Sequence, residues 1–167
     1  MAKTTRPTAF WLVKGNKNYP TAWDRRDGNI RAALEGPQAE GTWGTGHPIP
    51  ADFDRGHGIF YWSSSPDCYV IGLGTVIDPN TGNDGEYNTF QLSFLEGPFE
   101  RTITLADLRG ALPPRADGVV ASFLRPGDAR TIYAMTNNQA QCIASQIVRS
   151  GNNRGCAERR LQEWRLL

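Results

Sequence analysis

Two apolar segments rich in β-branched and aromatic residues constrain the fold more than any other part of this sequence. They are residues 58–63 (GIFYWS) and residues 69–77 (YVIGLGTVI), and each has the length of a strand. A polar turn at residues 64–67 (SSPD) lies between them. Because a short polar turn lets two neighbouring apolar strands pair antiparallel, this pattern predicts a β-hairpin.

Further segments on both sides of the hairpin have strand or helix periodicity. Strands are expected at residues 9–13, 89–95 and 130–135. Helices are expected at residues 23–34, 103–112, 138–149 and 157–165. Ser and Thr are favoured at helix N-caps, so Thr104 or Thr102 should cap the second of these helices and Thr136 with Asn137 the third. Strands interspersed with short helices indicate the α+β fold class.

The remaining segments are typical of loops. Residues 36–58 are rich in Gly, Pro and Thr and are expected to form a long loop that holds Trp43. Residues 78–85 (DPNTGNDG) are expected to form an acidic turn. With 167 residues there is room for one domain and its core, and the expected architecture is a strongly bent β-sheet or small β-barrel flanked by short helices.

Charge is unevenly distributed although the formal net charge is only +1. Residues 1–31 hold seven basic and two acidic residues, and residues 101–167 hold ten and five. Residues 59–100 hold six acidic and no basic residues. Two basic segments brought together by the fold would form a surface for nucleic-acid phosphates. Solvated charges without a partner explain the same pattern, so charge alone leaves both interpretations open.

The sequence indicates a soluble protein of the cytoplasm. No apolar run approaches the ~20 residues that a membrane span needs, and the first residues lack the apolar stretch of a signal peptide. The three cysteines, Cys68, Cys142 and Cys156, are widely spaced and odd in number. This spacing favours reduced thiols over a disulfide framework.

Few residues suit catalysis. His47 and His57 are the only histidines, neither lies in an HxH, HExxH or HxE pattern, and nothing supports a zinc site with Cys68. The serines at 63–65 lack a GxSxG frame, and the glycines of residues 41–46 and 72–74 do not match a phosphate-binding loop. We therefore expect no catalytic set, no cofactor and no metal.

Trp43 is the most suggestive residue, because small neighbours surround it in the segment GTWGTG, residues 41–46. Small neighbours leave an indole accessible, and stacking a nucleobase on an accessible aromatic ring contributes about 1–3 kcal/mol. A tryptophan that fills the core from a loop fits the same sequence. The residues by themselves leave these two roles open.

Four segments, taken in order, resemble the EVE domain, a member of the PUA-like group related to YTH domains. They are FWLVK followed by Gly15 and Asn16, GTWGT at residues 41–45, FYWS with VIGLGTV at residues 60–76, and ITLADLR at residues 103–109. Trp62 stands where the family has His, and the family's Arg-Asn-x-x-Ala-Arg-Asn stretch is missing. The resemblance covers residues 8–150 and implies a PUA-like fold for them. Residues 1–7 are then a tail, and residues 151–167 are expected from their own sequence to form a basic, helical extension whose Leu161 and Trp164 pack on the domain.

The resemblance implies recognition of one modified nucleobase, lifted out of its strand and held in an aromatic pocket. By position, Trp43 is the first stacking ring and Phe94 the opposite wall. The other residues expected at the base are Asn16, Thr45, Trp62 and Ser63, and those expected at phosphates are Lys14, Lys17, Arg125 and Arg130. Each has a plainer alternative: a core ring, a side chain bonded to its own backbone, or a solvated cation.

Three functional hypotheses follow. The first is a non-enzymatic reader of a modified base, such as methylated or hydroxymethylated cytosine or methylated adenine, in DNA or RNA. Its partner would be nucleic acid, not a membrane, and a separate effector such as a nuclease would act on what it reads. The second is a small hydrolase acting on a modified nucleoside; related hydrolases need a Lys-Glu-Arg cluster near the first strand, and no Glu lies near Lys14. The third, an RNA-binding accessory protein, predicts equal affinity for modified and plain strands and a steep salt dependence.

Overall fold

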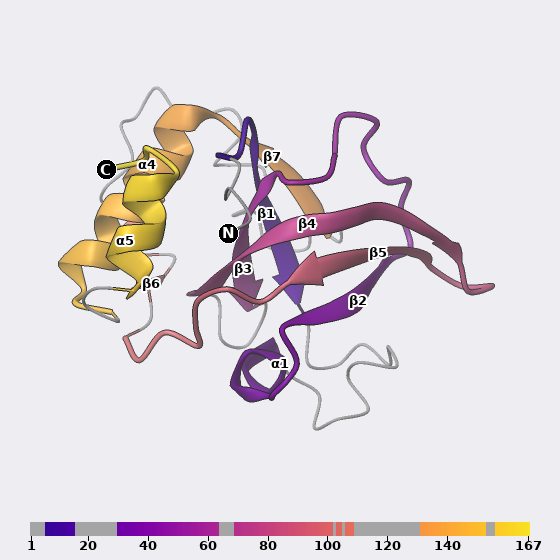
Figure 1. The fold of residues 1–167 in the computed structure, drawn as a ribbon, viewed down its shortest axis with the longest axis horizontal. Coiled ribbons are helices and arrows are strands. Elements are labelled where there is room, and N and C mark those ends of the chain that lie inside the picture. Colours follow the sequence, from indigo (N-terminus) through magenta and orange to yellow (C-terminus); the bar gives the residue numbers. More distant parts are fainter. Residues whose placement is uncertain are drawn as a thin grey trace, which may run out of the picture.

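A bent, mostly antiparallel β-sheet forms the centre of the protein in its computed structural model (Figure 1). The structure describes residues 6–15, 30–63, 69–101, 103–104, 106–108, 131–152 and 156–167. Its strands are β1 (Phe10–Gly15), β2 (Glu40–Thr45), β3 (Gly58–Ser63), β4 (Tyr69–Asn83), β5 (Asn88–Ser93), β6 (Ile103–Thr104) and β7 (Ile132–Met135). Its helices are α1 (Ile30–Glu35), α4 (Asn137–Arg149) and α5 (Cys156–Glu163).

The strands lie in the order β2-β5-β4-β3-β1-β7, and β6 pairs with β4 beside this path. Strands β1 and β3 are parallel, whereas the other pairs are antiparallel. The hairpin expected from the sequence is confirmed as β3 and β4. Among the described strands β2 and β7 form the two edges, so the sheet is open rather than a closed barrel. The α+β fold class is confirmed.

Strand β4 bends the sheet because it takes part in two pairings. Its first part pairs with β3, and from Val76 onward it pairs with β5. The register shifts twice in the second pairing, between Val76 and Asp78 and between Asp78 and Gly82. Irregularities of this kind bend a strand and increase its twist. The strong bend expected from the sequence therefore arises within one long strand.

Two loop predictions are wrong. Residues 36–58 contain β2, whose Trp43 pairs with Phe90 of β5. Residues 78–85 do not form a separate turn, because β4 continues to Asn83. Gly, Pro, Asn and Asp are depleted in strands, so neither segment carries a local strand signal. In β4 the side chains of Asp78 and Asn80 accept hydrogen bonds from backbone N–H groups two residues later, at 3.0 Å each.

The expected helix at residues 103–112 begins later than predicted. Ile103 and Thr104 form β6, which pairs with Val70 and Tyr69 of β4, and residues 106–108 are helical. Thr104 caps this turn: its Oγ1 accepts from the Asp107 N–H at 3.3 Å, and its own N–H donates to Asp107 Oδ2 at 2.8 Å. The N–H and the hydroxyl of Thr104 both donate to Asp107 Oδ2, at 2.8 Å each, and these two bonds hold the pKa of Asp107 below its ordinary value. Thr102 and residues 109–112 lie outside the described residues.

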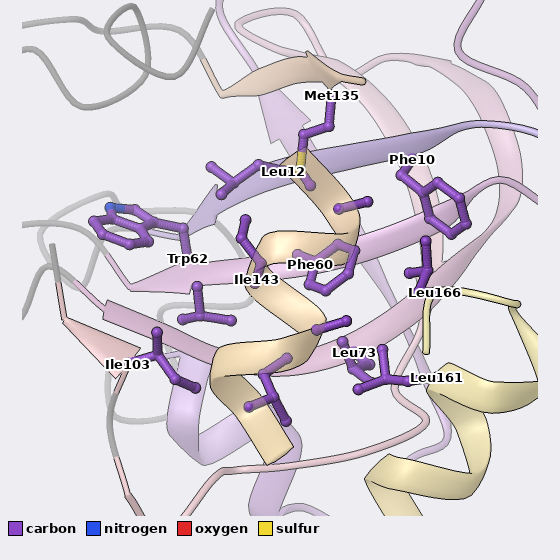
Figure 2. Packing of buried hydrophobic residues seen from close by; sticks show 14 of the residues in the cluster. Phe10, Leu12, Phe60, Trp62, Leu73, Ile103, Met135, Ile143, Leu161 and Leu166 are labelled. Carbon is purple, nitrogen blue, oxygen red and sulfur yellow. The ribbon is translucent and has the colours of Figure 1, made fainter. Parts of the chain in front are cut away.

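Helices α4 and α5 cover one face of the sheet (Figure 1). The predicted cap of α4 is confirmed at Thr136, which forms a reciprocal capping box with Gln139, whereas Asn137 is the first residue of the helix itself. The apolar face of α4 packs with Leu161 and Trp164 against side chains from β1, β3 and β7. Figure 2 shows α4 crossing over this cluster, with Ile143 above Phe60. We call this face of the sheet the helix face.

The opposite face carries a second buried cluster, which we call the aromatic face. Its members include Trp11, Trp43, Phe53, Tyr61 and Phe90, and Leu34 of α1 packs against it. Residues 23–29 of the predicted first helix lie outside the described residues, and α1 begins at Ile30. Successive side chains of a strand point to opposite faces, so β1 and β3 supply residues to both clusters.

Candidate functional site

Tyr61 and Trp62 are neighbours on β3 but lie on opposite faces of the sheet. Trp62 belongs to the cluster on the helix face and is 4% exposed. Figure 2 shows its indole beneath Leu12 and beside Ile143. Trp43 belongs to the aromatic face. The structure therefore does not bring Trp62 together with Trp43, and the alternative that Trp62 is a core residue describes its position.

Trp43 packs on the aromatic face with one ring stacked on Tyr61. The two ring centroids are 5.3 Å apart and the ring planes differ by 24°. The indole Nε1–H donates to the backbone oxygen of Lys14 at 3.2 Å, which ties β2 to the end of β1. Only 7% of Trp43 is exposed. A base that stacks on this indole must therefore displace side chains that now cover it.

Phe94 contacts the same tyrosine. Its ring centroid is 5.7 Å from that of Tyr61, and the planes are tilted by 44°. Trp43 and Phe94, which the resemblance assigned as two walls of one pocket, are thus joined through a third ring. We call Trp43, Tyr61 and Phe94 the aromatic row. The sequence does not single out Tyr61, because in the run IFYW no local signal tells which aromatic residue faces Trp43.

Gly74 has no side chain and so leaves room for the Tyr61 hydroxyl. The Tyr61 hydroxyl is fully buried and donates to the Ser93 backbone oxygen at 2.6 Å. Burial raises the pKa of this hydroxyl well above its ordinary value, so it remains a neutral donor. A Cβ on Gly74 would lie 2.6 Å from the Tyr61 hydroxyl oxygen and would collide with the Ser93 oxygen. The Gly72-Leu73-Gly74 pattern in the sequence was the available signal for this close approach.

Two predicted polar residues lie next to the aromatic row along their strands. Thr45 follows Trp43 by two residues on β2, and Ser63 follows Tyr61 by two residues on β3. Both are buried, at 2% and 5% exposure. Thr45 Oγ1 accepts from the backbone N–H of His47 at 3.2 Å, so at least one of its lone pairs serves local structure. Asn16 lies outside the described residues.

Lys14 directs its side chain toward the helix face. Its Nζ donates to the Tyr133 hydroxyl at 2.9 Å and lies 4.5 Å from the centroid of that ring. Lys14 therefore contributes a backbone carbonyl to the Trp43 side of the sheet, whereas its ammonium group contacts β7. Three other predicted phosphate contacts, Lys17, Arg125 and Arg130, lie outside the described residues.

A cleft of about 230 Å³ opens at the Phe94 end of the aromatic row. It lies between the chain that leaves α1 and the chain that follows β5. Its lining residues are Leu34, Gly36, Pro37, Gln38, Ala39, Phe94, Leu95, Glu96 and Gly97. Trp43 does not line it. Polar atoms make up most of the surface that these residues present to the cleft.

Glu96 is the ionisable residue of this cleft. Its side chain is 13% exposed, and its Oε1 lies 3.6 Å from the Nε of Arg160 on α5. Burial raises the pKa of Glu96, and the positive charge of Arg160 opposes this effect. The Arg160 Nε is buried and has no hydrogen-bond partner among the described residues, so the ion pair is a loose one.

Neither a metal site nor a membrane span is found in the described part of the chain. No group of three or more His, Cys, Asp and Glu residues there could hold a metal ion. His57 Nδ1 instead accepts from the Trp11 Nε1–H at 3.0 Å and from the Asp54 N–H at 3.2 Å, which places the proton of the neutral ring on Nε2. No helix within the described ranges has the length and apolar character to span a bilayer.

Comparisons with known proteins support the fold. No family model and no curated protein matches the sequence. Human THYN1, solved in complex with 5-methylcytosine-containing DNA, is similar with a TM-score of 0.60 and 14% identity, over 83% of this chain and 97% of that one. Rpa0253 from Rhodopseudomonas palustris has a TM-score of 0.52 and 21% identity, over 81% and 91%. Atu2648 from Agrobacterium tumefaciens has a TM-score of 0.58 and 11% identity, over 86% of this chain and 93% of that one. The chain therefore shares the fold of these three proteins over most of its length.

Proposed function

We propose that this protein is a non-enzymatic reader of a modified nucleobase in DNA or RNA. The observation that carries the proposal is the aromatic row, in which the two rings assigned from the sequence, Trp43 and Phe94, both contact Tyr61. A cleft lined by Phe94 opens at one end of this row, and a base that reaches Trp43 or Tyr61 must displace the side chains that cover them. The structural likeness to THYN1, whose solved complex contains methylated DNA, supports the same ligand class.

The physical basis of such reading is apolar contact. A methyl group on a base adds apolar surface, and burying one methyl or methylene group is worth about 0.8 kcal/mol. Stacking on an aromatic side chain adds about 1–3 kcal/mol per base. Leu34, Pro37 and Leu95 are among the residues that line the cleft. Contacts to phosphates remain assigned to Lys17, Arg125 and Arg130, as proposed from the sequence.

Direct binding measurements test the proposal. Fluorescence anisotropy would compare oligonucleotides of one sequence carrying cytosine, 5-methylcytosine, 5-hydroxymethylcytosine or N6-methyladenine at the same place, as single and double strands of DNA and RNA. We expect one modified strand to bind at least fivefold more tightly than its plain counterpart, which corresponds to about 1 kcal/mol. Equal affinity for all strands, with a steep salt dependence, would instead indicate an accessory protein that binds phosphates alone.

Two tryptophans make a matched pair for locating the base. Trp43→Leu and Trp62→Leu each remove a buried indole, at 7% and 4% exposure, from opposite faces of the sheet. Replacing a buried aromatic residue by alanine lowers the free energy of unfolding by about 3–5 kcal/mol. Replacement by leucine, which is larger than alanine, should cost less. Binding is compared at a temperature at which circular dichroism shows both variants folded. Trp43→Leu and Phe94→Leu should weaken the preference for the modified strand, whereas Trp62→Leu should not. A stronger loss in Trp62→Leu would refute the aromatic row as the site.

A further inference from the structure

Strand β2 forms one edge of the described sheet, and no described strand pairs with its outer side (Figure 1). The Phe94 N–H donates to the Ala39 oxygen at 2.8 Å, which fixes the β2 positions that bond to β5. Bonded and non-bonded positions alternate in an antiparallel pair, so the backbone N–H and C=O groups of Glu40, Thr42 and Gly44 point away from β5. Within the described part of the chain, no hydrogen bond is found for these outward groups.

The outer edge of β2 lacks the features that usually prevent pairing with another chain. Proteins protect a free edge with a proline, a lysine, a bulge or an inward-pointing charge. Residues 41–45 (GTWGT) contain no proline and no charged residue, and the register of β2 against β5 runs from Glu40 to Thr45 without a shift. Glu40 and Thr42 are exposed and Gly44 is half-buried. The edge is therefore regular and accessible, as the addition of a further strand requires.

The part of the sheet next to this edge is acidic. Strands β2, β4 and β5 and the connection at residues 84–87 hold no basic residue and four acidic ones, Glu40, Asp78, Asp84 and Glu86. Their carboxylates accept hydrogen bonds from backbone N–H groups, a tyrosine hydroxyl and a glutamine amide. None of the four forms an ion pair with a described residue. The negative charge here is therefore not compensated by a cation within the described residues.

Charge decides between the possible occupants of this edge. Nucleic acid is disfavoured, because its phosphates would be repelled by the four carboxylates. A second copy of this chain would bring the same four negative charges to the same edge, so pairing between two β2 strands is disfavoured as well. An extended peptide that contains lysine or arginine pairs with β2 through its backbone, and its side chains are attracted to the carboxylates.

We propose that the outer edge of β2 binds an extended, basic peptide segment of a partner protein, which adds a strand to the sheet. The backbone groups of Glu40, Thr42 and Gly44 supply the hydrogen bonds, and the carboxylates of β2, β4 and the connection at residues 84–87 select a positively charged segment. This inference goes beyond the proposed function, because it concerns a protein partner and holds whether or not the protein reads a base.

Fluorescence anisotropy with labelled peptides somewhat longer than β2 tests the proposal. The probe alternates lysine with threonine, because threonine favours an extended backbone. One control peptide has glutamate in place of each lysine. A second control keeps the lysines but has every backbone nitrogen methylated, which removes the donors for strand pairing. The lysine peptide should bind roughly tenfold or more tightly than either control, and added salt should weaken its binding.

Variants of the protein locate the peptide. Thr42→Pro removes one outward N–H and leaves the bonds to β5, and proline is tolerated on an edge strand in this orientation. It should weaken binding of the lysine peptide roughly tenfold, whereas Thr42→Ala, which keeps the N–H, should not. Glu40→Gln combined with Glu86→Gln should weaken binding as well. Glu100→Gln, which removes an exposed carboxylate outside these strands, is the matched control. Circular dichroism checks that each variant is folded.

Several results would overturn the inference. No binding of the lysine peptide, or equal binding of the lysine and glutamate peptides, would exclude selection of a basic segment. Equal binding of the lysine peptide and its methylated form would indicate contact through charge without an added strand, and this comparison needs no variant of the protein. A dimer of the protein alone in sedimentation, lost in Thr42→Pro, would assign the edge to a second copy. Because no oligonucleotide is used, failure of the reader function leaves these results unchanged.

Discussion

The Tyr61 hydroxyl and Gly74 offer a sharp test of how the aromatic row is held. An alanine methyl group at position 74 would lie 2.6 Å from the Tyr61 hydroxyl oxygen, 2.8 Å from Tyr61 Cε2, and against the Ser93 carbonyl oxygen. Two of these contacts involve the partners of one buried hydrogen bond. Gly74→Ala must therefore move either the tyrosine ring or the β5 backbone.

The size of the effect follows from two contributions. Overpacking a well-packed core costs about 1–3 kcal/mol. Losing the Tyr61 to Ser93 bond and leaving its groups buried costs about 1–3 kcal/mol more. We expect Gly74→Ala to lower the free energy of unfolding by about 3 kcal/mol. For a chain of this length, that loss lowers Tm by about 6–12 °C.

Urea unfolding followed by circular dichroism, with thermal melts alongside, measures this loss. Gly46→Ala is the matched control, because a Cβ at position 46 would have no neighbour within 4 Å. Its free energy of unfolding should stay within about 0.5 kcal/mol of wild type. In a Tyr61→Phe background, which lacks the hydroxyl, Gly74→Ala should cost less than in the wild type. Equal stability of Gly74→Ala and Gly46→Ala would refute the close approach of Tyr61, Ser93 and Gly74.

Three further predictions concern other contacts. Thr136→Ala removes the N-cap of α4 and should lower the free energy of unfolding by about 1 kcal/mol, whereas the exposed Asn138→Ala should change it little; urea unfolding checks both. Asn152→Ala should lower the free energy of unfolding by about 2–3 kcal/mol in the same assay, because the buried Asn152 amide accepts from the Arg101 N–H at 2.6 Å and donates to the Arg101 carbonyl oxygen at 2.5 Å. Unchanged stability of this variant would contradict the prediction. Burial raises the pKa of Glu96 above its ordinary 4.5, so the folded state holds this proton more tightly than the unfolded state. Stability should therefore decline as pH rises from that value through the raised pKa, and urea unfolding of Glu96→Gln along the same pH series should lack this component.

The sequence determined those parts of the structure that have a local physical signal. The β3–β4 hairpin follows from two apolar runs around a polar turn, and α4 follows from its apolar spacing and its Thr136 cap. Strand β2 had no such signal, because Gly and Thr surround its single tryptophan. Its strand conformation depends on hydrogen bonds to β5, which is distant along the chain, and propensity at the segment itself does not reveal them.

The sequence also indicated some residues of the candidate site and not others. The sequence singled out Trp43 and Phe94 by their type and their order in the chain. Alternation along a strand shows which of its residues share a face, but it does not show which face meets another strand's residues. Only the tertiary structure decided that Tyr61 joins Trp43 while Trp62 packs under α4. Only the tertiary structure placed Glu96 in a cleft beside Phe94, because the lining comes from two segments that lie far apart in the chain and are brought together by the pairing of β2 with β5.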